Sequence, residues 1–111
     1  MTVLADKKCI PCEGNVPPLA LPAAQSLMKE LDAQWQLVDE GRLLARGFKF
    51  KDFTETMQFV NKIAEIAETE GHHPDLTVSY NTLTVELMTH AIGGLSENDF
   101  IVASKIDALH K

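Results

Sequence analysis

Apolar residues recur at helical spacing in three segments of the chain and alternate with polar residues in four others. The helical segments are residues 21–34, 53–69 and 97–109. The alternating segments, which predict strands, are residues 35–38, 42–50, 76–80 and 83–90. The resulting order α-β-β-α-β-β-α contains two hairpins separated by a helix. It predicts an α+β fold, in which a four-stranded antiparallel sheet has helices packed on one face.

Residues at the ends of these segments support the boundaries. Asp52 stands at an N-cap position with Glu55 three residues later, which is typical of a capping box before the central helix. Gly71 is placed to end that helix, so we expect His72-His73-Pro74 to lie in the loop beyond it. The two hairpin turns are expected at Asp39-Glu40-Gly41 and Asn81-Thr82. The last strand should present one apolar face, formed by Leu83, Val85 and Leu87.

The central helix has an unusually wide apolar face. Its apolar residues are Phe53, Met57, Phe59, Val60, Ile63, Ala64, Ile66 and Ala67. At helical spacing they cover close to half of the circumference, which is wider than one contact with a sheet usually requires. Either part of this face contacts another subunit, or the helix is buried deeply in its own core.

The N-terminal segment differs in composition from the rest of the chain. Its turn-forming residues are Pro11, Gly14, Pro17 and Pro18. We therefore expect an irregular arm over residues 1–20 and a single domain over residues 21–111, because 111 residues suffice for one domain and not for two.

Charge and hydropathy exclude several classes of partner. The net charge of −6 argues against a nucleic-acid surface, which needs clustered basic residues. No apolar run approaches the roughly 20 residues that cross a bilayer. Asp6 and Lys7-Lys8 stand where a signal peptide would need an apolar core. We expect a cytoplasmic protein with neither nucleic acid nor membrane as a partner.

The two cysteines form one C-x-x-C motif, Cys9 and Cys12. A structural zinc site needs two more ligands at comparable spacing, and a thioredoxin-type motif should follow a strand and open a helix. Here the motif lies in the predicted arm. Three uses stay open: thiols without a special role, a metal or interchain contact, and redox chemistry.

Three of the four histidines fall where a site could form. His72 and His73 follow the central helix, and His90 ends the last predicted strand, whereas His110 is in the tail. Glu68 lies four residues before His72, where a carboxylate could orient an imidazole. Asp99 could approach His90, although with Ser96 it matches the cap of the last helix.

Imidazoles serve metal binding, acid–base catalysis and the activation of a nucleophile. No serine stands in a strand-to-helix elbow, and the cysteines lie far away, so the nucleophile interpretation has no support. Three histidines and a glutamate match a known metal-ligand set, but an adjacent pair lacks the spacing that directs two side chains at one ion. Histidines without a special role in a polar loop are a further alternative. General acid–base catalysis is the interpretation we favour, with no metal.

The segments FKFKDF, AETEGHHPD, TVELMTHAIGGLS and ASKID resemble the pterin-4a-carbinolamine dehydratases. The combination of H-H-P with a distal T-H is the most specific part of this resemblance. The arm segment KKCIPCEGNVPPL is similar to the arm of many bacterial and plant-type members. The resemblance therefore covers nearly the whole chain.

The resemblance implies a lyase that dehydrates a 4a-hydroxytetrahydropterin, such as 4a-hydroxytetrahydrobiopterin, to the quinonoid dihydropterin. This reaction recycles the pterin cofactor of aromatic amino-acid hydroxylases, and it requires neither a metal nor an organic cofactor. The implied catalytic set is His72, His73 and His90, in which His72 and His90 move protons and His73 orients the pterin. The implied substrate contacts are Glu68, His72, His73, Pro74, Thr89, His90, Ala91 and Ile92, with Asp99 in a supporting role.

The resemblance also bears on partners. Members of the family are commonly dimers or tetramers, so a homodimer or homotetramer is expected, and contact with another subunit becomes the favoured explanation of the wide helix face. Some members serve molybdopterin metabolism, and animal members are dimerisation partners of a homeodomain transcription factor. The alternative function is therefore a non-catalytic interaction module, or a pterin-binding protein linked to molybdopterin metabolism.

Overall fold

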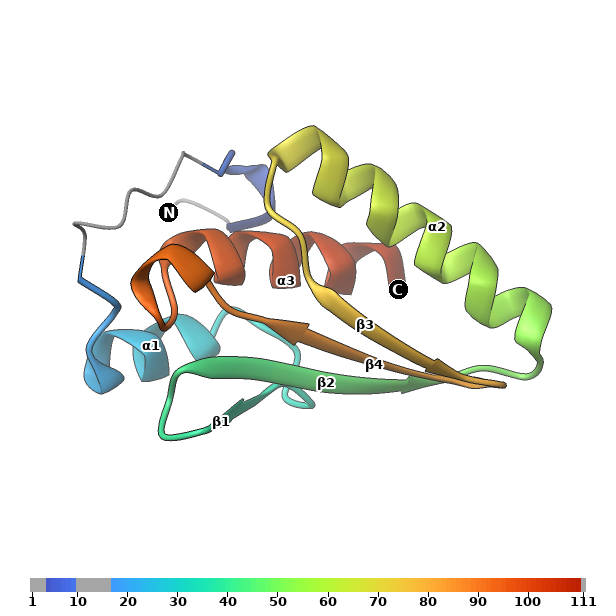
Figure 1. The fold of residues 1–111 in the computed structure, drawn as a ribbon, viewed down its shortest axis with the longest axis horizontal. Coiled ribbons are helices and arrows are strands. Elements are labelled where there is room, and N and C mark those ends of the chain that lie inside the picture. The colour runs from blue at the N-terminus through green and yellow to red at the C-terminus, as the bar shows by residue number, and fades with distance from the viewer. Residues whose placement is uncertain (1–3, 10–16, 111) are drawn as a thin grey trace.

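A computed structural model describes residues 4–9 and 17–110, and its elements follow the predicted order (Figure 1). The α-helices are α1 (Leu21–Met28), α2 (Phe53–Glu70) and α3 (Glu97–His110). The strands are β1 (Gln36–Val38), β2 (Leu43–Lys49), β3 (Asp75–Ser79) and β4 (Thr82–Leu87). Two 3₁₀ turns complete the described part, η1 (Leu4–Asp6) and η2 (His90–Ile92).

The four strands form one antiparallel sheet in the order β1-β2-β4-β3, with α2 and α3 on the same face (Figure 1). The sheet contributes alternate buried side chains to the core, namely Leu44, Phe48, Leu83, Val85 and Leu87. The apolar face that the alternation predicts for the last strand is therefore confirmed, as is the α+β architecture. Between the layers lie Phe59 and Ile63 from α2 and Phe100 and Ile106 from α3.

Helix α3 is buried around most of its circumference over its first two turns. All residues from Asn98 to Ser104 are buried, the polar ones included. A helix that is covered on all sides packs against more than one layer. Here α3 is contacted both by α2 and by η1 of the N-terminal segment. This burial places the carboxylate of Asp99 inside the protein, with 0% exposure.

Helix α2 begins and ends as the sequence predicts. The Asp52 side chain accepts a hydrogen bond from the Glu55 N–H at 2.8 Å, and Gly71 ends the helix in the left-handed conformation at φ +67°. The Glu55 carboxylate accepts from the Lys51 N–H rather than from that of Asp52, so the capping box is shifted by one residue. The left-handed glycine turns the chain sharply and delivers His72 into the loop before β3.

Only one stripe of α2 enters the core: Thr56, Phe59, Ile63 and Ala67. Phe53 remains 50% exposed and Ala64 is exposed, while Met57 and Val60 are partly covered. These four residues follow at i, i+4, i+7 and i+11 and form a second apolar stripe beside the buried one. The explanation of the wide face by deep burial in its own core therefore fails for this side of the helix.

Three predicted boundaries are wrong. Helix α1 ends at Met28, because the next three residues form i→i+3 hydrogen bonds and not helical ones. The second hairpin turns at Tyr80-Asn81, since Ser79 pairs with Thr82 and Tyr80 takes a φ of +51°. Strand β4 ends at Leu87, so His90 lies in η2 and not on the strand.

A buried ion pair joins β2 to the end of α3. The Arg46 guanidinium, 4% exposed, lies 2.6 Å from an Asp107 carboxylate oxygen that also accepts from the Trp35 indole N–H at 2.7 Å. The guanidinium also stacks over the Phe48 ring at 4.3 Å. Asp107 is therefore the nearer of two carboxylates that neutralise this buried cation, the other being Asp32 at 3.8 Å.

Part of the segment expected to be irregular is regular in the structure. Residues 4–6 form η1, whose Leu4 is 2% exposed and belongs to the hydrophobic core. Cys12, the second residue of the C-x-x-C motif, lies outside the described residues. Over residues 4–9 and 17–110, no helix has the length and apolar character needed to cross a membrane.

Candidate active site

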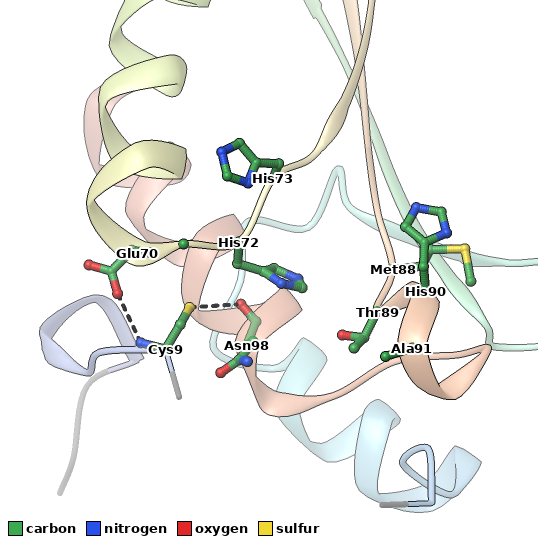
Figure 2. A pocket seen from close by; sticks show the side chains of 10 residues that line it. Cys9, Glu70, His72, His73, Met88, Thr89, His90, Ala91 and Asn98 are labelled. Carbon is green, nitrogen blue, oxygen red and sulfur yellow. Dashed lines mark hydrogen bonds between the residues drawn. The ribbon is translucent and has the colours of Figure 1, made fainter. Parts of the chain in front are cut away.

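A cavity of about 530 Å³ opens where the end of α2, the η2 turn, the start of α3 and the N-terminal segment meet (Figure 2). Its lining residues are Cys9, Glu70, Gly71, His72, His73, Met88, Thr89, His90, Ala91 and Asn98. The three histidines singled out in the sequence thus lie around one cavity, although eighteen residues separate His72 from His90.

The His72 ring is held by a buried carboxylate. Its Nε2 lies 2.6 Å from Asp99 Oδ1. The other oxygen, Oδ2, accepts from the Ser96 N–H at 2.9 Å and from the Thr89 hydroxyl at 2.8 Å. A carboxylate with these three contacts acts as acceptor in each, so the hydrogen on the His72 ring belongs on Nε2. The neutral ring then carries its lone pair on Nδ1.

Asp99 therefore caps α3 and orients His72 at the same time. The cap predicted for it with Ser96 is present, since Oδ2 binds the Ser96 N–H. Its imidazole partner is His72 and not His90, because the cavity side of α3 faces the loop after α2. Thr89 is held between Asp99 and Ser96. Its hydroxyl gives its hydrogen to Asp99, so the Ser96 hydroxyl donates to Thr89 Oγ1 at 2.7 Å.

The η2 turn that carries His90 is closed by backbone bonds. The Thr89 N–H donates to the Gly94 carbonyl at 2.8 Å, and the Gly93 N–H donates to the His90 carbonyl at 3.2 Å. A side chain at Gly94 would meet the Pro18 ring at 2.7 Å, so glycine lets the segment before α1 pack against this turn. His90 and Ala91 are both exposed on the cavity side.

His73 has a different environment from His72. Its Nε2 lies 2.6 Å from the Glu68 carboxylate, with both side chains more than half exposed. Glu68 therefore contacts His73, and not His72 as the four-residue spacing suggested. Exposed pairs of this kind contribute little to stability, about 0–1 kcal/mol. Of the two residues, His73 lines the cavity and Glu68 does not.

The predicted substrate contacts and the residues that line the cavity are not the same set. Of the residues expected to contact substrate, Glu68, Pro74 and Ile92 do not line the cavity. The wall also includes five residues that were not predicted to belong to the site: Cys9, Glu70, Gly71, Met88 and Asn98. Gly71, next to the histidine pair, could have been found from spacing. Cys9 could not, because 62 residues separate it from Gly71 in the chain.

Cys9 and Glu70 form one end of the cavity. The Glu70 carboxylate, with 7% of its side chain exposed, accepts from the Cys9 N–H at 2.8 Å and lies 3.7 Å from Lys105 Nζ. The Cys9 thiol donates to the Asn98 carbonyl, with 3.7 Å between sulfur and oxygen. Burial, and secondarily the charge of Glu70, raises the pKa of this thiol to about 12. The thiol is therefore neutral at physiological pH.

The remaining histidine is remote from this cavity. His110 is the last residue of α3, and its ring packs at 5.0–6.2 Å from the rings of Phe48, Phe50 and Phe59. It is therefore part of α3 rather than of a frayed tail. Within residues 4–9 and 17–110, no three His, Cys, Asp or Glu side chains are placed to hold a metal ion together. The cavity lining includes three imidazoles, which can give and take protons, and the Glu70 carboxylate.

Comparison with known proteins gives one consistent family. The family described as pterin 4 alpha carbinolamine dehydratase matches residues 17–109. A relative from Nitrosomonas europaea, provisionally named a pterin-4-alpha-carbinolamine dehydratase, is 55% identical over 97% of this chain and 94% of its own. A relative of the same provisional name from Rickettsia canadensis is 51% identical over 97% of this chain and 98% of its own.

Solved structures agree with the fold. A crystal structure described as a transcriptional coactivator/pterin dehydratase from Brucella melitensis has a TM-score of 0.79 and 35% identity, and covers 85% of this chain and 99% of its own. A pterin dehydratase-like protein described as a RuBisCO assembly factor in the alpha-carboxysome has a TM-score of 0.59 and 22% identity, over 68% and 88% of the chains. The second likeness shows the fold alone. The same fold thus occurs in proteins described in different terms, and function has to be argued from the site.

Proposed function

This chain belongs to the pterin-4a-carbinolamine dehydratase family, and from that premise we propose that it dehydrates a 4a-hydroxytetrahydropterin to the quinonoid dihydropterin by histidine acid–base catalysis. The observation that carries the proposal is the cavity around which His72, His73 and His90 gather, with His72 bound to the buried Asp99 carboxylate. The reaction would recycle the pterin used by aromatic amino-acid hydroxylases.

The chemistry requires two proton transfers. The C4a–O bond breaks, a double bond forms between C4a and N5, the departing hydroxyl takes up a proton, and N5 loses its own. One proton is given and one is received, so a neutral and a protonated imidazole exchange states in the reaction, and proton exchange with solvent restores them before the next turnover. Each positioned proton carrier typically accelerates such a step by about 10²–10⁴-fold.

We assign the base to His72. Its Nε2–H is directed at Asp99, which leaves the Nδ1 lone pair to accept the N5 proton. His90 stands on the η2 side of the cavity and delivers a proton to the hydroxyl that leaves. His73, which lines the cavity and is held by Glu68 at 2.6 Å, binds and orients the pterin.

Single-histidine variants test these roles. Stopped-flow dehydration of synthetic 4a-hydroxytetrahydropterin should be slower by about 10²-fold or more in kcat for His72→Ala and His90→Ala. For His73→Ala we expect a higher KM with kcat largely kept. His110→Ala is the matched control, because it removes an imidazole that does not line the cavity, and it should keep the wild-type rate. Near wild-type kcat in both His72→Ala and His90→Ala would refute the assignment.

We also propose that the chain forms a homodimer or homotetramer through the second apolar stripe of α2. Phe53 is half exposed and continues into Met57, Val60 and Ala64 along one side of the helix. Sedimentation should give a mass of two or four chains, and Phe53→Asp should shift the protein toward smaller species. A wild-type monomer at high concentration would exclude this assembly.

A further inference from the structure

The first described part of the N-terminal arm, residues 4–9, is held to the domain by three contacts. Leu4 is 2% exposed within the hydrophobic core. Lys7 Nζ lies 2.9 Å from the Glu97 carboxylate at the start of α3. The Cys9 N–H donates to Glu70 at 2.8 Å, at the end of α2. The arm is thus bound to the two helices that border the cavity.

The third of these contacts brings the arm to the cavity itself. Cys9 lines it together with Glu70 and Asn98. Figure 2 shows Cys9 and Glu70 on one side of His72, with Thr89, His90 and Ala91 on the other. A molecule that fills the cavity beside His72 therefore lies between the arm and the η2 turn.

We propose that the N-terminal arm is one wall of the substrate site, and that Cys9 is a substrate-contact residue that positions the pterin against His72. This inference rests on the proposed function and extends it to a part of the chain that lies more than sixty residues before the histidines. Thr89, His90 and Ala91 form the opposite wall.

The chemistry of Cys9 suits a contact surface and not a nucleophile. The pKa of the thiol is raised to about 12, chiefly by burial, so little thiolate exists at physiological pH. Its hydrogen is directed at the Asn98 carbonyl. The sulfur that remains is a small, polarisable surface of the kind that packs well against a flat conjugated ring. No bond to sulfur is formed or broken in this role.

The test adds bulk at two neighbouring positions of the arm. Cys9→Trp places a large side chain in the cavity wall, whereas Lys8→Trp places the same side chain at an exposed position that does not line it. We expect Cys9→Trp to raise KM for 4a-hydroxytetrahydropterin by about tenfold or more with kcat within about threefold of wild type, and Lys8→Trp to change neither. Cys9→Ser removes the polarisable sulfur but keeps a small donor, so it should raise KM by less than Cys9→Trp does, with kcat kept.

A second variant reaches the arm without touching the cavity. Leu4→Ala weakens the anchor of the arm in the core. It should also raise KM more than kcat changes, provided that circular dichroism shows an intact fold. Wild-type KM in Cys9→Trp would overturn the inference, and so would wild-type KM in a folded Leu4→Ala whose arm has become sensitive to proteolysis.

A binding measurement separates this inference from the proposed function. Quenching of the fluorescence of oxidised pterin reports binding without turnover. If wild type dehydrates the substrate and Cys9→Trp behaves as wild type in both assays, the inference fails and the function stands. If wild type binds pterin without dehydrating 4a-hydroxytetrahydropterin, and Cys9→Trp binds at least about tenfold more weakly, the function fails and the contact stands. Absence of both binding and turnover in wild type would refute both.

Discussion

Replacing Asp99 by asparagine changes the partner of His72 while keeping nearly the same shape. The Ser96 N–H can only donate, so the single oxygen of the new side-chain amide has to face it, at the place where Oδ2 now lies. The amide nitrogen then faces His72 Nε2. Because that nitrogen is a donor, His72 must turn its Nε2 lone pair toward it and carry the hydrogen on Nδ1. The substitution therefore reverses the tautomer of the proposed base.

The expected fall in kcat follows from the loss of the lone pair on His72 Nδ1. The wrong tautomer removes the lone pair that should accept the substrate proton, so kcat should fall by about 10²-fold or more, the lower end of the contribution of a positioned base. KM should change little, since Asp99 is 0% exposed and does not line the cavity. The hydrogen bond to a charged group at 2.6 Å becomes a neutral one, which should lower the free energy of unfolding by about 1 kcal/mol.

Three measurements together identify the cause. Stopped-flow kinetics give kcat and KM, and urea denaturation gives the free energy of unfolding. The ¹⁵N shifts of the His72 ring report the tautomer directly, with hydrogen on Nε2 in wild type and on Nδ1 in Asp99→Asn. Asp75→Asn is the matched control, because it makes the same chemical change at an exposed carboxylate just beyond the histidine loop.

Two results would exclude a role of Asp99 in catalysis through the tautomer of His72. If Asp99→Asn keeps kcat within about twofold of wild type while His72→Ala is inactive, the tautomer of His72 does not matter for the reaction. If kcat falls but the ring shifts show hydrogen on Nε2 in both proteins, Asp99 acts through something other than the tautomer, such as the position of α3.

Three further predictions concern the free energy of unfolding. Asp107→Ala removes the nearer carboxylate from the buried Arg46 and leaves Asp32 at 3.8 Å, so it should cost about 3 kcal/mol in urea denaturation; a loss below about 1 kcal/mol would show that Asp32 or solvent compensates the guanidinium. The pKa of Cys9 is raised from 9.0 to about 12, so the stability that the neutral thiol contributes is present below pH 9.0 and is lost as the pH rises toward 12. Wild type should therefore lose stability relative to Cys9→Ser between pH 8 and pH 11, and parallel curves would contradict the burial of this thiol. Glu68→Gln changes a largely exposed pair, so the free energy of unfolding should shift by less than about 1 kcal/mol, and a larger loss would mean that the Glu68–His73 pair is shielded from water.

The parts of the fold that short-range patterns determine could be predicted. The cap at Asp52, the left-handed Gly71 and the alternation of Leu83, Val85 and Leu87 each depend on residues within a few positions of one another. Such local signals define the elements and their order. They also place His72 and His73 in a loop, and this placement alone is enough to make the pair a candidate for the site.

Long-range contacts at the site could not be predicted in the same way. The spacing of Glu68 and His72 suggested a pair, yet the turn at Gly71 directs His73 toward Glu68 and sends His72 to Asp99, 27 residues ahead. Cys9 reaches the cavity because burial of Leu4 and the contacts of Lys7 with Glu97 and of Cys9 with Glu70 hold this segment in place. Both results depend on how α3 packs between the sheet, α2 and the arm, and no local pattern encodes that packing.

Histidine-catalysed dehydration can be measured with synthetic 4a-hydroxytetrahydropterin by stopped flow, for the wild type and for the double variant His72→Ala/His90→Ala. We expect the wild type to accelerate the reaction strongly over buffer, and the double variant, though folded and able to bind oxidised pterin, to fall to the uncatalysed rate. A wild type without acceleration, or a double variant that retains most of the wild-type rate, would contradict this expectation.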